Sequence, residues 1–163
     1  MNRQLVVFHI ANEHYGVNIG EVESIIRMQP ITVIPHAQRS IVGATNLRGR
    51  VLPVVDLRKR FGLPEAEPTG ETRIVIVELA DQRVGMIVDA VSEVLRVAEE
   101  RIEPPSPVVT TAALTFITGI VRLAAGRLIA LLNLERMFAP EEQADQPSVR
   151  VDDGDVGTRG RGE

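Results

Sequence analysis

The stretch LVVFHIANEHYGVNIGEVESIIR, residues 5–27, occurs a second time in the chain as IVIVELADQRVGMIVDAVSEVLR, residues 74–96. The two stretches align over 23 residues without a gap, with five identical positions and most apolar positions matched. Self-similarity of this kind is typical of a fold built from duplicated units. We therefore expect two copies of one unit within the chain.

A second pair of similar stretches follows in the same order. IVGATNLRGRVLPVVDL, residues 41–57, aligns with ITGIVRLAAGRLIALLNL, residues 117–134, after one inserted residue. Asp56 of the first stretch then falls on Asn133 of the second. Two matches in one order argue against a chance resemblance and support the duplication.

The first copy has the pattern of a β-rich unit. An apolar run at residues 5–11, a polar turn and a second apolar run at residues 15–19 indicate a β-hairpin. Val22, Ile25 and Ile26 then recur at the spacing of one helical face. That segment fits either a short helix or a turn followed by a strand.

The second stretch of the first copy reads as two more strands joined at Arg48-Gly49-Arg50. The glycine supplies the positive φ that a tight turn needs. Pro53 lies inside the later strand and cannot donate a ladder hydrogen bond, which predicts a strand at a sheet edge or a bulge.

The composition also favours sheets. The apolar residues are mostly Val, Ile, Leu and Ala, with four Phe, one Tyr and no Trp, and β-branched side chains fit pleated surfaces. A unit of about five short strands without a helical layer removes its edges by closing into a small barrel. We expect a mostly β protein of two packed barrels, with repeats at about residues 5–62 and 73–139 of one domain, residues 1–139.

Charge is unevenly distributed along the chain. The net charge of −4 lies entirely in residues 140–163, and residues 1–139 carry equal numbers of acids and bases. A balanced body argues against a nucleic-acid binder, because such binding depends on a broad basic surface. The acidic tail has few large apolar residues, so we expect it to be disordered.

The chain contains no cysteine, which excludes a disulfide framework and a thiolate nucleophile. Its first apolar run is too short for a secretory signal, and later apolar stretches are interrupted by Arg122 and Arg127. These features predict a cytoplasmic protein that does not insert directly into a membrane.

No motif in the chain supports catalysis. His9 and His14 would point to opposite faces if one strand ran through both, and neither they nor His36 show metal-ligand spacing. No nucleophile elbow or P-loop occurs. The carboxylates that stand out are explained as turn and helix caps: Asp56, Asp89 and Glu93. We expect a binding protein rather than an enzyme, without metal or cofactor.

Several stretches together resemble the CheW-like domain of bacterial chemotaxis coupling proteins over residues 5 to about 139. The matching stretches are YGVNIGEVESIIR, PITVIP, IVGATNLRGRVLPVVDLRKRFG, VGMIVDAVSEVL and ITGIVRLAAGRLIALLNLERMF. The resemblance implies two intertwined five-stranded SH3-like barrels with short helices. It also implies a non-catalytic adaptor that couples the cytoplasmic tips of methyl-accepting chemoreceptors to the regulatory domain of the histidine kinase CheA, at membrane-associated receptor arrays.

The resemblance assigns residues to two surfaces. A receptor hairpin would dock in an apolar groove between the barrels, at positions that match the family's motif: Val22, Ser24, Ile25, Leu47 and Arg48. Ile19 and Ile31 would face the kinase domain. The family usually has a glutamate where this chain has Ser24, whereas the second copy keeps Glu93.

Other readings stay open at this stage. Residues 58–60, Arg-Lys-Arg, are explained as a solvated helical face. Within the same family, the chain could serve a non-flagellar chemosensory pathway such as twitching or gliding motility. A small ligand-binding β-barrel protein is a further alternative, although the sequence shows no polar pocket for it.

Overall fold

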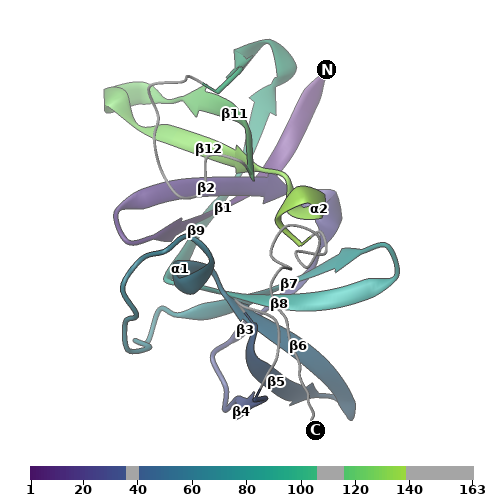
Figure 1. Cartoon of the computed structure of the whole chain (residues 1–163). Coiled ribbons are helices and arrows are strands. Elements are labelled where there is room, and N and C mark those ends of the chain that lie inside the picture. The colour runs from purple at the N-terminus through teal and green to yellow at the C-terminus, as the bar shows by residue number, and fades with distance from the viewer. Residues whose placement is uncertain (36–40, 106–115, 139–163) are drawn as a thin grey trace, which may run out of the picture.

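The computed structural model describes residues 1–35, 41–105 and 116–138 (Figure 1). The strands are β1 (Asn2–Ile10), β2 (Glu13–Asn18), β3 (Val22–Arg27), β4 (Thr32–Val33), β5 (Ile41–Leu47), β6 (Arg50–Asp56), β7 (Arg73–Leu79), β8 (Gln82–Val88), β9 (Ala90–Ala98), β10 (Ile102–Glu103), β11 (Ile117–Arg122) and β12 (Leu128–Leu132). The helices are short: α1 (Leu57–Arg60), α2 (Leu134–Met137), and the 3-10 turns η1 (Ile19–Glu21), η2 (Glu99–Arg101) and η4 (Ala124–Gly126).

The strands form two sheets that exchange hairpins between the two copies. One sheet, here called barrel A, has the order β10-β11-β12-β2-β1-β9, and the other, barrel B, has the order β3-β7-β8-β6-β5-β4. Each holds five longer strands and one strand of two residues. The hairpin of each copy lies in the barrel completed by the other copy, so the prediction of two intertwined five-stranded barrels is confirmed.

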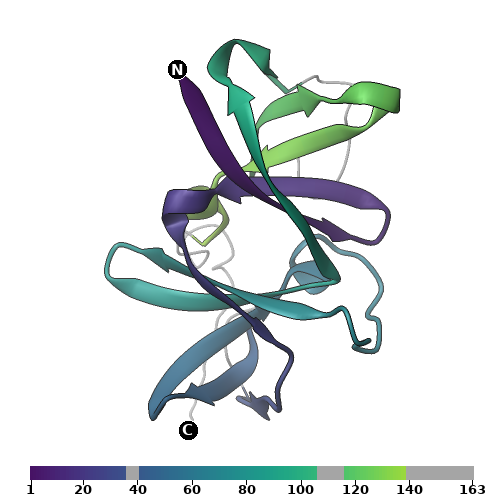
Figure 2. The ribbon, with the colours of Figure 1, turned by 180° about the vertical axis from the view of Figure 1, so that it is seen from behind.

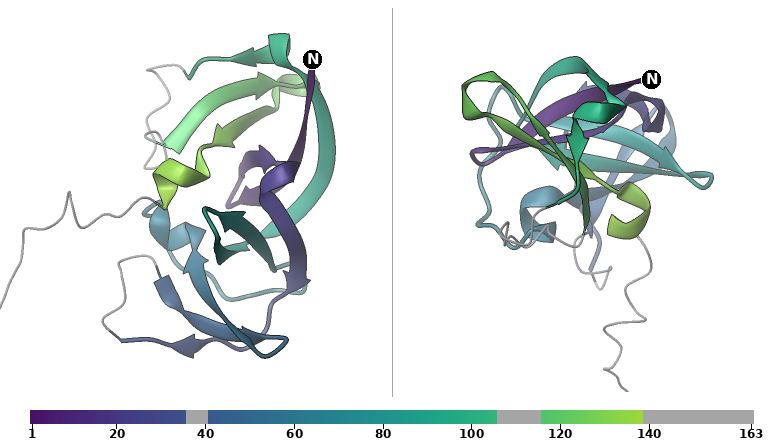
Figure 3. Two further views of the ribbon diagram at one scale, coloured as in Figure 1. Left: turned by 90° about the vertical axis from the view of Figure 1, so that its right-hand side faces the viewer. Right: turned by 90° about the horizontal axis from the view of Figure 1, so that it is seen from above.

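The views from behind and from the side show how the chain passes between the barrels. In Figure 2, β3 runs from the upper barrel into the lower one, and β9 runs from the lower barrel into the upper one. Figure 3 places α1 and α2 on the same side of the molecule. The two strands connect the barrels in opposite directions, which makes the barrels inseparable parts of one body.

Three apolar clusters correspond to this architecture. The largest combines residues of both sheets and lies between the barrels, including Phe8, Tyr15, Val75, Val77 and Met86. The second belongs to barrel A alone, with Leu5, Val7, Ile129 and Leu131 among its members. The third belongs to barrel B, with Leu52, Ile74 and Ile76 buried and Leu47 and Ile26 packed against them. We call them the inter-barrel, barrel A and barrel B clusters.

The exchanged hairpins join their barrels through parallel strand pairs that require glycine. β2 pairs with β12 at Gly16, and β8 pairs with β6 at Gly85. A Cβ at Gly85 would lie 2.7 Å from Cγ2 of Ile74, and one at Gly16 would lie 3.2 Å from Cγ2 of Ile129. The two glycines shared by the copies therefore allow close packing at equivalent junctions.

The ambiguous segment after the first hairpin is a strand with a bulge. β3 pairs with β7 through Val22↔Val77 and Ser24↔Ile76, so the register shifts between these pairs. A bulge adds one residue to one strand and resets its alternation of faces. Val22 and Ile25 therefore lie on the same face of β3 although they are three residues apart. Their partners on β7 are Val77 and Val75, two members of the inter-barrel cluster. This explains a spacing that resembles a helix.

The turn at Arg48-Gly49 is confirmed, because both residues have positive φ, 54° and 81°. Of the two alternatives for Pro53, the edge strand is wrong, because β6 lies between β5 and β8. A register shift does occur beside Pro53 in the β5–β6 ladder, but its extra residue is on β5, between Ile41 and Gly43. Parallel pairing with β8 begins only at Val54, one residue after the proline. Pro53 pairs with Ala44 of β5 and lies outside the ladder with β8, where its missing N–H costs nothing.

The structure changes the interpretation of the two histidines of the first hairpin. His9 and His14 do not lie on one continuous strand; they are direct partners across the β1–β2 hairpin, with ring centroids 5.5 Å apart. His36 and the tail at residues 139–163 lie outside the described residues. Among the described residues, no helix is long and apolar enough to span a membrane.

The basic segment at α1 is not a solvated face. Arg58 Nη2 pairs with Asp89 Oδ2 at 2.7 Å. Arg60 Nη2 donates to the carbonyl oxygen of Met137 at 2.8 Å, and its guanidinium lies 4.5 Å from the ring centroid of Phe116. Both arginines link elements of different copies, and among the three basic residues only the side chain of Lys59 is exposed.

Candidate binding surface

The residues assigned to the receptor surface lie on barrel B, but on two sides of its sheet. Val22 packs against the inter-barrel cluster, and Ile25 is 39% exposed beside Val75 of that cluster. Ser24 is opposite Ile76, which belongs to the barrel B cluster. The bulge in β3 is the cause, because it separates Ser24 from the face shared by Val22 and Ile25.

The β5–β6 turn carries the other two assigned residues. Leu47 is half-buried and packs against the barrel B cluster. Arg48 is exposed at the tip, and among the described residues its side chain forms no hydrogen bond or ion pair. Asn46 Oδ1 accepts a hydrogen bond from the Gly49 amide at 2.9 Å, which holds the turn. Arg48 is therefore presented on a defined turn with its five donors free.

The two residues assigned to the kinase surface lie beyond opposite ends of β3. Ile19 is 39% exposed in η1, and Ile31 is half-buried just before β4. β3 has six residues, which corresponds to roughly 20 Å along a strand. Beside Ile19, burial and the charge of Glu135 raise the pKa of Glu21. A partner that contacts both isoleucines would have to follow the length of β3.

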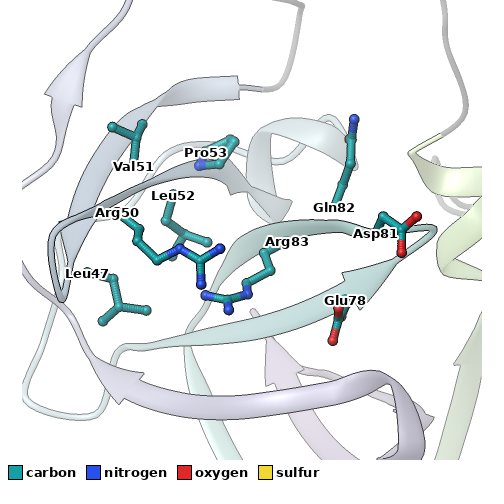
Figure 4. Close-up of a pocket in the computed structure, with 9 residues that line it drawn as sticks. All are labelled: Leu47, Arg50, Val51, Leu52, Pro53, Glu78, Asp81, Gln82 and Arg83. Carbon is teal, nitrogen blue, oxygen red and sulfur yellow. The ribbon is translucent and has the colours of Figure 1, made fainter.

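A pocket of about 400 Å³ opens at the mouth of barrel B (Figure 4). It is lined by Leu47, Arg50, Val51, Leu52, Pro53, Glu78, Asp81, Gln82 and Arg83. β6 and β8 form its sides, because their parallel pairing covers only Val54–Asp56 and the strands diverge before it. Leu47 and Leu52 belong to the packing of the barrel B cluster and give the pocket an apolar floor.

The charged groups around this pocket are unequally paired. Arg83 Nε pairs with Glu23 Oε1 at 2.9 Å. Glu78 is the cross-strand partner of Arg83. Arg50 forms no side-chain hydrogen bond or ion pair within the described part of the chain. Sequence reasoning missed Arg50 and Arg83. A comparison of the two copies would have shown that the acid after the equivalent valine occupies a different position in each copy.

Apolar residues are exposed at equivalent positions of the two copies. Ile25 and Val94 correspond in the repeat and are 39% and 54% exposed. Val51 and Leu128, the first apolar residues after the equivalent turns, are 78% and 44% exposed. Single exposed apolar side chains are common on protein surfaces and indicate a contact site only where they form a contiguous patch.

The candidate carboxylates act as structural groups. Asp56 Oδ1 accepts a hydrogen bond from the Arg58 amide at 3.0 Å, and Asn133 Oδ1 accepts one from the Arg136 amide at 2.9 Å. These equivalent residues cap α1 and α2. Glu93 pairs with Arg127 at 3.5 Å instead of capping a turn. Among the described residues, no group of three or more metal-ligating side chains is present.

Comparisons with known proteins agree with this architecture. Residues 4–142 match the model of the CheW-like domain. The chain is 36% identical over 141 residues to the chemotaxis protein CheW of Rhizobium meliloti, covering 86% of this chain and 90% of the relative. It is 34% identical over 143 residues to CheW of Treponema pallidum, covering 85% of this chain and 84% of the relative.

A solved structure resembles the whole fold. The crystal structure of the scaffolding protein TtCheW from Thermoanaerobacter tengcongensis superposes with a TM-score of 0.77 at 41% sequence identity. The match covers 86% of this chain and 90% of that chain. The two-barrel arrangement is thus shared with a solved relative.

Proposed function

The chain belongs to the CheW-like domain family, and from this premise we propose that it couples the cytoplasmic tips of methyl-accepting chemoreceptors to the regulatory domain of the histidine kinase CheA. The family consists of non-catalytic adaptors in chemotaxis signalling. An adaptor works by binding two partners at once, so its surfaces rather than a reaction centre carry the function. Relatives named as chemotaxis proteins favour this pathway over twitching or gliding motility, and over a small ligand-binding barrel protein.

The observation that carries the proposal is the free arginine at the β5–β6 turn. Arg48 is exposed and has no side-chain partner among the described residues, although it occupies a left-handed backbone conformation with φ of 54°. That conformation costs roughly 1–2 kcal/mol for a non-glycine residue. An unpaired guanidinium on a defined turn suits recognition of a carboxylate or of carbonyl groups at a helical hairpin tip.

We assign the receptor surface to the part of barrel B around this turn. Its proposed members are Val22, Ser24, Ile25, Leu47 and Arg48. Val22 and Ile25 contribute apolar contacts on the side that faces the other barrel, while Leu47 supports Arg48 from within barrel B. A helical hairpin lying across the edge of barrel B would contact both groups.

We assign Ile19 and Ile31, which lie beyond the two ends of β3, to the kinase surface, whereas β3 itself carries the proposed receptor residues. Ile19 is 39% exposed and lies outside the buried core, so its side chain can contact a partner. We further propose that residues 1–139 form the functional unit, that the protein has no catalytic role or cofactor, and that it works in the cytoplasm, recruited to receptor arrays.

Calorimetric titration would test this proposal directly. The purified protein would be titrated separately with the CheA regulatory domain and with a chemoreceptor cytoplasmic fragment from the same genome. We expect micromolar binding to each, and a complex of all three by gel filtration. Binding to only one partner, or mutually exclusive binding, would contradict the bridging role.

A further inference from the structure

We propose that the pocket at the mouth of barrel B receives an acidic side chain of the bound chemoreceptor, and that Arg50 is the residue that anchors it. This inference rests on the proposed function, because the receptor is taken as the partner at this turn. It goes further by naming the chemistry that the partner must present and the residue that selects it.

The two copies differ in the order of two residues on equivalent strands. The first copy has Glu23-Ser24 after Val22, whereas the second has Ser92-Glu93 after Val91. Both strands are bulged at this place: the register shifts between Val22 and Ser24 in one ladder and between Phe8 and Val7, the partners of Val91 and Glu93, in the other. The backbone is therefore equivalent, and only the position of the acid changes.

The changed position directs the acid to a different arginine in each barrel. In barrel A, Glu93 Oε2 lies 3.5 Å from Arg127 Nη2. In barrel B, Glu23 Oε1 lies 2.9 Å from Arg83 Nε. Arg50 is the residue equivalent to Arg127, and its natural intramolecular partner would be a glutamate at position 24.

Ser24 cannot replace that glutamate because its side chain carries no charge. Arg50 consequently has no side-chain partner among the described residues. In barrel A the equivalent arginine, Arg127, is paired with Glu93, whereas in barrel B Arg50 lines the 400 Å³ pocket. Barrel A thus serves as an internal comparison in which the equivalent arginine, Arg127, is paired with a carboxylate.

The side chains that line the pocket indicate which chemical group of a partner could bind there. In Figure 4, Arg50 lies across the pocket from Glu78 and Asp81, and the Arg83 side chain lies between them. The two guanidinium groups point toward one another, and Leu47 and Leu52 lie beside the Arg50 side chain. A carboxylate on a short apolar stem matches this arrangement, since it would pair with Arg50 while its methylene groups contact the leucines.

Continuity with the proposed receptor surface identifies the occupant as the receptor. Leu47 lines the pocket and also belongs to the receptor surface. Arg50 begins β6 immediately after the turn that presents Arg48. A receptor hairpin that contacts Arg48 would therefore pass the mouth of this pocket, and we expect it to carry a Glu or Asp there.

The test restores in barrel B the ion pair seen in barrel A. Ser24→Glu should neutralise Arg50 within the protein and lower affinity for the receptor fragment about tenfold. Ser24→Gln has the same size without the charge, so it measures the effect of added bulk at this surface and should lower the affinity clearly less than Ser24→Glu. Arg50→Gln should weaken receptor binding to a similar degree and reduce its dependence on salt. Binding of the CheA regulatory domain should stay within twofold in all three variants.

The outcomes distinguish a failure of the proposed coupling function from a failure of the acidic-residue inference alone. If the unchanged protein does not bind the receptor fragment, the coupling function and this inference both fail. If it binds and neither Ser24→Glu nor Arg50→Gln has an effect, only the acidic-residue inference is overturned. Because Arg50 is exposed, Arg50→Gln should melt like the unchanged protein, and it decides the question even if Ser24→Glu does not fold.

Discussion

Arg58 of α1 and Asp89, the residue between β8 and β9, form an ion pair that ties the two barrels together. The Arg58 Nη2 to Asp89 Oδ2 distance is 2.7 Å, and Asp89 Oδ2 also accepts a hydrogen bond from the Ala11 amide at 2.7 Å. Arg58 follows a strand of barrel B, and Ala11 lies in the β1–β2 turn of barrel A. One carboxylate thus connects three segments at the place where the chain passes between barrels.

Removing this link should destabilise the fold. We expect Arg58→Met to lower the free energy of unfolding by about 1–3 kcal/mol, because a part-buried charged hydrogen bond is lost and Asp89 is left without its cation. Lys59→Met is the matched control, since Lys59 contacts Glu65 only at 3.9 Å and is exposed, and it should cost less than about 0.5 kcal/mol. Urea unfolding followed by circular dichroism measures both; equal effects would contradict the role of Arg58.

The same pair predicts how stability depends on pH. Burial opposes ionisation of Asp89, but the hydrogen bonds from Arg58 and Ala11 outweigh it and lower its pKa in the folded protein. The unfolded chain therefore binds the proton first as pH falls below about 4. The difference between the unchanged protein and Arg58→Met should be full near pH 7 and should shrink as pH falls through the lowered pKa of Asp89. A difference that stays constant down to pH 3 would argue against this link.

Asp56 is expected to behave in the opposite way. Burial raises its pKa despite backbone hydrogen bonds from Arg58 and Lys59, so its charged form is disfavoured in the folded protein. The second copy uses Asn133 as the equivalent cap, and Asn and Asp are similar N-caps. Asp56→Asn should therefore keep α1 and raise stability slightly at pH 7, by less than about 1 kcal/mol. The gain should disappear below the unfolded pKa of about 4, where Asp56 is neutral in both states.

Arg48 allows a test that separates binding from folding. Asn is tolerated in the left-handed region better than most residues, so Arg48→Asn should leave the melting temperature unchanged or slightly higher. The same variant should weaken receptor binding, because the exposed guanidinium is removed. Pulldown with the receptor fragment and thermal melting would be measured together. Unchanged binding by Arg48→Asn would exclude Arg48 from the interface.

Ile19 offers the corresponding test for the kinase surface. Its side chain is 39% exposed, so Ile19→Glu should fold while placing a charge in an apolar contact. We expect at least a tenfold loss of affinity for the CheA regulatory domain and little change in receptor binding. Loss of cooperative melting would show instead that Ile19 belongs to the core, and Ile19→Ala would then measure the contact with less disturbance.

The repeat explains how much of this fold could be predicted from sequence. Matching residues 5–27 with residues 74–96, and Asp56 with Asn133, correctly indicated two equivalent units. That Asn133 caps α2 as Asp56 caps α1 came from the structure. The exchange of hairpins left no local signal, because a strand has the same pattern whichever copy pairs with it. The prediction of intertwined barrels therefore came from the family resemblance. The bulge in β3 also escaped prediction, since it changes which face a residue joins without changing the residue types.

The candidate site was harder to predict for the same reason. Arg58 and Arg60 looked like a solvated basic face, because their partners, Asp89 and Met137, are distant in sequence. Arg50 drew no attention until its equivalent, Arg127, was found paired with Glu93. Long-range pairing decides the role of each arginine, and residue spacing carries no information about it.

The junction glycines provide a last test, which concerns the exchanged hairpins themselves. A Cβ at Gly85 would lie 2.7 Å from Cγ2 of Ile74 and 3.2 Å from Cδ2 of Leu52, both in the barrel B cluster. Gly85→Ala should therefore force the cluster apart and lower the free energy of unfolding by about 1–3 kcal/mol. Gly20→Ala is the control, because a Cβ at Gly20 meets no atom within 4 Å.

Gly16→Ala should fall between these two variants. Its Cβ would lie 3.2 Å from Cγ2 of Ile129 and 3.4 Å from Cδ2 of Leu131, so the neighbours need to move by only a few tenths of an ångström. The expected order of destabilisation is Gly85→Ala, then Gly16→Ala, then Gly20→Ala, measured by urea unfolding at one pH. If Gly85→Ala were as stable as Gly20→Ala, the parallel junction between β6 and β8 would be looser than the packing described here, and glycine at that position would need another explanation.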